Sequence, residues 1–239
     1  ATWSNNNKKS KSSRKLGKAA SDRSLQVNDN EEENPEQPPP ADPAIEKQVQ
    51  ENISKLASLM ETTLGPAYTR IAEKQRGQMR LVIFVRTENQ ADFTDLDIIC
   101  ENTGVGHVLA NKGGIVMSLT YLNCTRLSFL SAHLAAHEGD KYYAARCDNL
   151  DEILNGAKTH QYYDVSLSSH HFFVMGDLNF RCRFKEDTED NPAVKQALKL
   201  IKKQKFQKLY DDHDELIKGI EAGDLLVDFE TLPCYFNPT

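Results

Sequence analysis

The chain has 239 residues, with 29 lysines and arginines against 35 aspartates and glutamates, so its formal net charge is −6. This acidic balance supplies no global basic field, and nucleic acid is therefore not an expected partner. Five cysteines without C-x-x-C or zinc-type spacing argue against a disulfide scaffold or zinc domain and indicate a reducing compartment, so a cytoplasmic location is expected. No apolar run approaches the roughly 18–20 residues of a membrane helix.

Residues 1–43 are predicted to be a disordered, low-complexity tail. The stretch "NNNKKSKSSRKLGK" is basic and serine-rich, and "NDNEEENPEQPPPADP" is acidic and proline-rich. Neither contains enough apolar surface to offset the entropy lost on ordering, so a solvated linker is expected. The alternative is that the lysines between Lys8 and Lys18 contact anionic lipid at a membrane surface. The folded domain is expected over residues 44–239.

Helices and strands alternate along this domain. Helical periodicity or helix end signals mark four segments: 45–64, 140–156, 191–210 and 213–223. Residues that favour strands mark six: 67–74, 80–86, 94–100, 113–122, 126–134 and 170–178. The third helix is expected to begin with Asn191 as its cap and Pro192 at its first position. Because hairpins and helices are interleaved, the pattern predicts a layered α/β protein with mixed, largely antiparallel sheets.

The stretch "HHFFVMGDLNFR", residues 170–181, ends a buried strand with polar residues. If the strand continues through Arg181, period-two alternation places Asp177, Asn179 and Arg181 on one face. Gly176 would allow the backbone to bend or to be approached closely. The alternative is a strand end followed by a polar turn, in which the Asp and Asn side chains make local hydrogen bonds.

Two other strand ends carry polar groups that suit a phosphate. "ANKGG" places Asn111 and Lys112 in a tight turn before a strand, where backbone amides and an ammonium can meet an anion. "SAHLAAHE" ends a strand with His133 and has His137 four residues on, on the same face if a helical turn follows. An ordinary turn and structural histidines are the alternatives. Zinc ligation is not expected, because the H-E-x-x-H pattern and a third ligand are missing.

In this order, the motifs resemble the inositol polyphosphate 5-phosphatase catalytic domain of the endonuclease/exonuclease/phosphatase superfamily. The resemblance covers roughly residues 64–239 and depends on N-K-G-G, S-x-H-L-x-x-H and G-D-L-N-[FY]-R occurring together. It implies a four-layer α/β/β/α sandwich, incomplete in this chain. It also implies Mg²⁺-dependent hydrolysis of the 5-phosphate of phosphoinositide lipids or soluble inositol phosphates, with peripheral contact to membranes.

The resemblance also implies roles for individual residues. Asp177 would orient and activate the attacking water, Asn179 would hold the transferred phosphate, and His133 would stabilise charge on its oxygens. The substrate pocket would be lined by Asn111, Lys112, His137 and Arg181. Phosphoryl transfer needs mainly positioning and charge neutralisation, which these residue types supply.

The chain departs from the family pattern in the groups that hold the metal, so its metal ligands stay unassigned. Gln50 and Glu51 match the family's Gln-Glu pair in type, but they fall in a predicted helix instead of after a strand. The family's later P-x-W-C-D-R and Ser-Asp-His motifs do not occur in the sequence. We therefore expect a partial catalytic domain with impaired turnover. The alternative is a non-catalytic derivative that binds phosphoinositide or protein.

Overall fold

The computed structural model describes residues 43–103, 112–158, 163–233 and 235. Residues 49–239 form one compact unit, and residues 43–48, the start of the first helix, belong to a second unit, Ala1–Gln48. The predicted elements occur in the predicted order, with two short helices, η1 and α3, that were not predicted. The elements are α1 (Pro43–Leu64), β1 (Tyr68–Arg76), β2 (Met79–Arg86), η1 (Thr87–Asp92), β3 (Phe93–Asn102), β4 (Gly113–Tyr121), β5 (Thr125–His133), α2 (Asp140–Gly156), α3 (Val165–Ser168), β6 (His171–Asp177), α4 (Ala193–Lys202), α5 (Phe206–His213) and α6 (Glu215–Ala222). The predicted tail lies outside the described residues.

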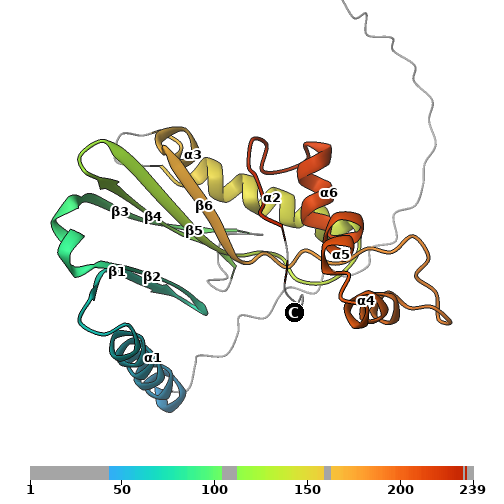
Figure 1. Ribbon diagram of the computed structural model, residues 1–239, viewed down its shortest axis with the longest axis horizontal. Helices are drawn as coiled ribbons and strands as arrows, with labels where there is room; N and C mark the ends of the chain where they lie inside the picture. The colour runs from blue at the N-terminus through green and yellow to red at the C-terminus, as the bar shows by residue number, and fades with distance from the viewer. Residues whose placement is uncertain (1–42, 104–111, 159–162, 234, 236–239) are drawn as a thin grey trace, which may run out of the picture. The chain divides into compact units, whose positions relative to one another are not determined.

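The strands form two sheets (Figure 1). The smaller sheet is the antiparallel pair β1 and β2, and the larger has the order β3-β4-β5-β6. In the larger sheet β4 is antiparallel to both β3 and β5, whereas β6 runs parallel to β5. The predicted mixed, largely antiparallel α/β architecture is confirmed.

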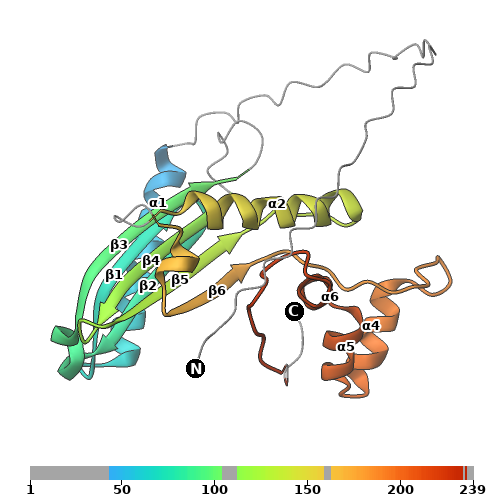
Figure 2. The ribbon, with the colours of Figure 1, turned by 90° about the horizontal axis from the view of Figure 1, so that it is seen from above.

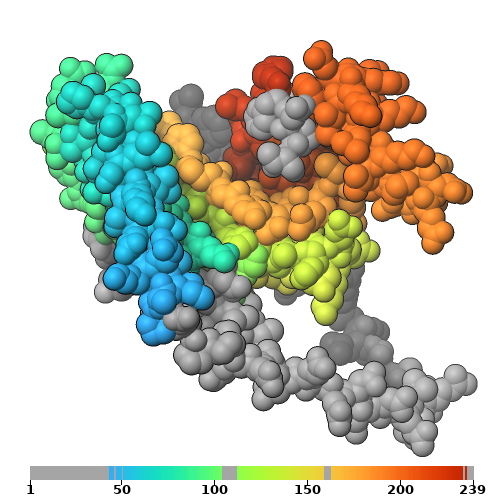
Figure 3. Space-filling view, turned by 90° about the horizontal axis from the view of Figure 1, so that it is seen from below, coloured from blue at the N-terminus to red at the C-terminus, as the bar shows by residue number. Residues whose placement is uncertain are grey.

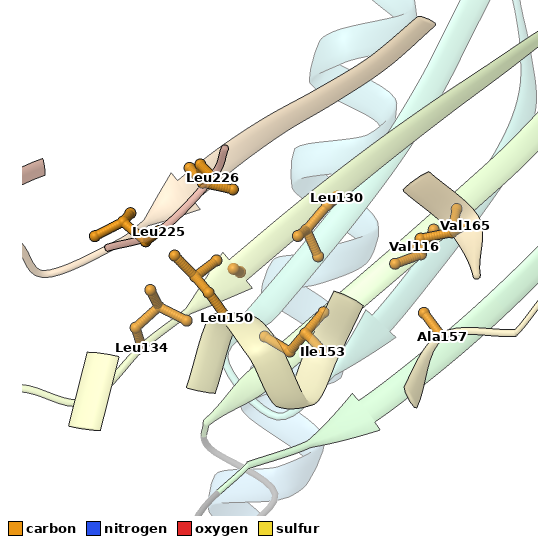
Figure 4. Close-up of a cluster of buried hydrophobic side chains, with 10 residues drawn as sticks. Val116, Leu130, Leu134, Leu150, Ile153, Ala157, Val165, Leu225 and Leu226 are labelled. Carbon is orange, nitrogen blue, oxygen red and sulfur yellow. The ribbon is translucent and has the colours of Figure 1, made fainter. Parts of the chain in front are cut away.

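Alternation along β4 gives the larger sheet two buried faces. Ile115 and Met117 pack against Met79 and Leu81 of β2, which joins the two sheets. Val116 points the other way, into the cluster of Figure 4, where β4 and β5 meet α2. Full burial of an aliphatic side chain of this size contributes roughly 1.5–3 kcal/mol, so both faces stabilise the domain.

Helix α2 covers the outer face of the larger sheet, and residues 49–64 of α1 contact the smaller sheet. Figure 2 shows α2 lying along the larger sheet, and Leu150 and Ile153 are the α2 side chains in the shared core. On the smaller sheet, Arg80 of β2 donates a hydrogen bond to the carbonyl of Ile53 in α1, and Arg70 of β1 pairs with Glu61. The resulting order, helix, sheet, sheet, helix, is the predicted four-layer arrangement.

The long helix predicted over residues 191–210 is wrong. The chain forms α4 and α5 with a break at 203–205, where Gln204 has a left-handed φ of 53°. Nor does Asn191 cap the helix, because Pro192 occupies the N-cap position and no side chain caps the helix there. Within the described residues, no helix is long and apolar enough to cross a membrane.

Candidate active site

Three polar side chains meet where β4 begins and β5 and β6 end. In the sheet register Gly113 pairs with His133, and His133 pairs with Asp177. Lys112 directly precedes β4, so it joins the same row. Its Nζ lies 2.6 Å from Nε2 of His133, and the same Nε2 lies 3.7 Å from Oδ2 of Asp177. Asp177 and His133, which lie 44 residues apart in the chain, are thus neighbours at these strand ends.

Two glycines permit this register. Gly113 has a φ of 137°, and a Cβ there would lie 2.0 Å from the carbonyl oxygen of Glu101 on β3. Gly176 has a φ of 123°, and a Cβ would lie 2.1 Å from the carbonyl oxygen of Ala132 on β5. A side chain at either position would push the strands apart, so both glycines are needed for close backbone approach.

The electrostatics of the row suit an anion. An ammonium group only donates, so the lone pair of His133 Nε2 accepts from Lys112. Burial lowers the pKa of Lys112, Asp177 opposes this shift, and the positive charge of Arg181 adds to it. The two cations therefore disfavour one another here, and a bound phosphate dianion would relieve that repulsion. The Asp177 side chain is 68% exposed, which leaves its carboxylate open to water.

The strand ends earlier than the alternation predicted. β6 stops at Asp177, and Asn179 has a left-handed φ of 58°. The backbone amide of Asn179 donates to Oδ1 of Asp177 at 3.2 Å, which is the local turn hydrogen bond of the alternative interpretation. Continuation of the strand through Arg181 is therefore wrong.

The turn nevertheless keeps Asn179 beside the row. Its Nδ2 donates to the carbonyl of Leu134, the residue after His133, at 3.1 Å. Its Oδ1 accepts from the guanidinium of Arg181 at 3.0 Å. These two bonds fix which way the amide points and leave one N–H of the amide for a ligand.

A buried ion pair, for which the sequence carries no local signal, supports this region. Glu215 of α6 and Arg146 of α2 are 4% and 0% exposed, and their side chains meet at 2.7 Å. Arg146 also donates to the carbonyls of Ala135 and His137, at 3.3 and 2.9 Å. Glu215 further accepts from the backbone amide of Arg181 at 3.0 Å. The pair thus ties together the two segments that follow β5 and β6.

The other predicted residues have mixed outcomes. Residues 134–136 form no helical turn, and His137, at a φ of 78°, packs its ring 5.1 Å from that of Tyr142. The helical turn that would have placed the two histidines on one face is therefore absent from these residues. Asn111 and the side chain of Gln50 lie outside the described residues. Glu51 lies on α1, in agreement with the predicted helix, and is exposed.

The described residues do not fit a complete magnesium site. Within them, no group of three or more His, Cys, Asp or Glu side chains is arranged to hold a metal ion. Asp177 offers one carboxylate, whereas Mg²⁺ requires an octahedral set of oxygen ligands.

Comparison with known proteins assigns the family. The sequence model of endonuclease/exonuclease/phosphatase family 2 matches residues 23–239, and the chain belongs to that family. Its curated relatives include phosphatidylinositol 3,4,5-trisphosphate 5-phosphatase 2B of Danio rerio, 28% identical over 77% of this chain and 14% of the relative. Inositol-1,4,5-trisphosphate 5-phosphatase 1 of Schizosaccharomyces pombe is 28% identical over 86% of this chain and 18% of its own length. The chain thus spans less than a fifth of each of these two relatives.

Solved structures share the fold. The inositol polyphosphate 5-phosphatase domain of spsynaptojanin, in complex with inositol (1,4)-bisphosphate and calcium ion, matches with a TM-score of 0.61 and 23% identity, over 82% of this chain and 53% of that one. A Cimex nitrophorin ferrous NO complex matches with a TM-score of 0.56 and 18% identity, over 81% of this chain and 60% of that one. One fold thus occurs in proteins with different ligands, so function has to be argued from the site.

Proposed function

We propose that this chain hydrolyses the 5-phosphate of phosphoinositide lipids or soluble inositol polyphosphates. The observation that carries the proposal is the single row Lys112, His133 and Asp177, with Asn179 beside it. These are the residues on which the resemblance to 5-phosphatases depends, and two of the curated relatives are named for that activity.

Each side chain has a role that its surroundings support. Asp177 is exposed, and among the described residues its ion-pair contact is the 3.7 Å one with His133, so it can accept a proton from a water molecule and orient it toward phosphorus. Lys112 keeps further N–H donors for phosphoryl oxygens as negative charge builds, and His133 can donate to them as well when its Nε2 carries a proton instead of accepting from Lys112. Asn179, whose amide orientation is fixed, can donate its remaining N–H to the transferred phosphate.

Arg181, Asn111 and His137 complete the proposed substrate pocket. Arg181 lies at its wall, where its guanidinium holds the Asn179 amide. Asn111 is assigned from the sequence motif alone. His137 belongs to the same strand-end segment as Leu134, although its ring packs beside Tyr142.

A divalent cation is part of the proposal, with Mg²⁺ as the expected ion. It would supply charge neutralisation to the phosphate. The described residues do not assemble its ligands, so we expect turnover by this chain to be slow. The second candidate function follows from the same observation: the scaffold binds inositol phosphates without hydrolysing them.

Incubation of the 239-residue chain with inositol 1,4,5-trisphosphate and Mg²⁺ tests the proposal. Slow formation of inositol 1,4-bisphosphate, identified by chromatography, supports hydrolysis at the 5-position. Saturable binding by calorimetry without any product supports the binding derivative. Absence of both binding and product contradicts both functions.

A further inference from the structure

A strongly basic segment lies outside the candidate site. Residues 195–208, "KQALKLIKKQKFQK", hold six lysines and no acidic residue, in a chain of net charge −6. The segment comprises most of α4, the break after it and the start of α5. We call its lysines, together with two exposed aliphatic residues of α4, the lysine surface: Val194, Lys195, Leu198, Lys199, Lys202, Lys203, Lys205 and Lys208.

The aliphatic residues of this surface are unusually accessible. Val194 is 70% exposed and Leu198 is 49% exposed, and they lie one helical turn apart on α4. Lys195 and Lys199 follow them at the same spacing, so a row of lysines runs beside the apolar row. Figure 3 shows the orange part of the chain, which includes α4, on the molecular surface.

Most of these charges have no acidic partner among the residues that the structure describes. Lys208 pairs with Asp212, and Lys195 donates to the backbone carbonyl of Asp190. In the described part of the chain, Lys199, Lys202 and Lys203 make no salt bridge. Their positive charge is therefore available to a partner.

The lysine surface adjoins the candidate site. Val194 and Ala197 of α4 line a groove of about 430 Å³ together with Arg181 and with Gly139, which lies two residues after His137. Because Arg181 contacts Asn179, a ligand that rests on the exposed face of α4 lies beside a groove that reaches the candidate site.

We propose that the lysine surface binds the anionic face of a lipid bilayer. Lysine beside exposed aliphatic side chains is the composition of helices that lie in a membrane interface, where the apolar groups insert and the ammonium groups meet lipid phosphates. Nucleic acid is the less suitable partner, because the segment has no arginine and one aromatic residue, and that residue, Phe206, is partly buried. This inference extends the proposed function, because a chain bound to a bilayer through the lysine surface would hold its candidate site near lipid substrates.

Co-sedimentation of the full chain with vesicles tests this inference. The vesicles contain phosphatidylcholine with about 30% phosphatidylserine and no phosphoinositide, so the result does not depend on the phosphatase function. We expect Lys199→Gln with Lys202→Gln to weaken binding by about 30-fold, from roughly fivefold per lysine near the surface. The matched control, Lys55→Gln with Lys74→Gln, removes two exposed lysines elsewhere and should bind like the unmodified chain.

Further experiments separate the apolar from the electrostatic contribution to vesicle binding. Val194→Ser with Leu198→Ser should weaken binding while leaving the charge unchanged, and binding should fall as salt is raised. Circular dichroism checks that each variant is folded. The proposal would be overturned if the test and control pairs lost vesicle binding equally, or if the chain bound equally well to vesicles of phosphatidylcholine alone. Binding of an oligonucleotide in preference to the vesicles would overturn it as well.

Discussion

Removal of the Glu215 carboxylate should expose how far the candidate site depends on the buried ion pair. Glu215→Ala leaves the guanidinium of Arg146 buried without its acidic partner, and it also frees the backbone amide of Arg181. Breaking a buried pair from one side typically costs about 3–5 kcal/mol, because an uncompensated charge stays in the interior. The side chains of Arg146 and Glu215 are 0% and 3% exposed, so this ion pair is fully buried.

Chemical denaturation measures this loss directly as a fall in the free energy of unfolding. By heat, a domain of this size loses about 2–4 °C of Tm for each kcal/mol, so a decrease of roughly 6–20 °C is expected. Glu221→Ala on the same helix is the control. Glu221 pairs with Lys218 at 2.9 Å but is 58% exposed, and such surface pairs contribute about 0–1 kcal/mol. Equal effects of the two substitutions would refute the role assigned to the buried pair.

Two other predictions follow from the strand ends. Gly176→Ala should lower the free energy of unfolding by about 2 kcal/mol more than Gly139→Ala. Both positions have positive φ, but only at Gly176 would the new Cβ meet backbone, at the carbonyl oxygen of Ala132. Equal denaturation midpoints of the two variants would contradict this close approach. Calorimetric titration with inositol 1,4,5-trisphosphate should show that Lys112→Ala weakens binding. Because burial lowers the pKa of Lys112, the charged form is lost at a lower pH than for an ordinary lysine, so affinity should decline early as pH rises, and Lys112→Arg should remove that decline.

Much of the site could be predicted from the sequence because strand ends carry a local pattern. The apolar run before Asp177, the glycines after Lys112 and the strand ending at His133 each mark one end of a strand, and the sheet register brings these ends together. The roles assigned to these residues remain predictions.

Other features depend on the backbone or on distant contacts and left no local signal. Asn179 and Gln204 both adopt left-handed φ values that end a regular element, although neither is glycine. The alternation of residues therefore predicts a strand that continues past the end of β6, and the helical periodicity predicts one helix across the break between α4 and α5. Arg146 and Glu215 are 69 residues apart in the chain, so nothing near either residue indicates that they are buried together.

The rate of phosphate release after Asp177→Asn tests the central claim most directly. The substrate is the headgroup of phosphatidylinositol 4,5-bisphosphate with Mg²⁺, measured at enzyme excess so that slow turnover is visible. Asp151→Asn, an exposed carboxylate on α2, is the matched control. We expect Asp177→Asn to lower the rate by about 100-fold or more while headgroup affinity stays within about threefold, since a water-activating group acts mainly in the transition state. Release by Asp177→Asn at the rate of the unmodified chain would contradict the assignment of this site.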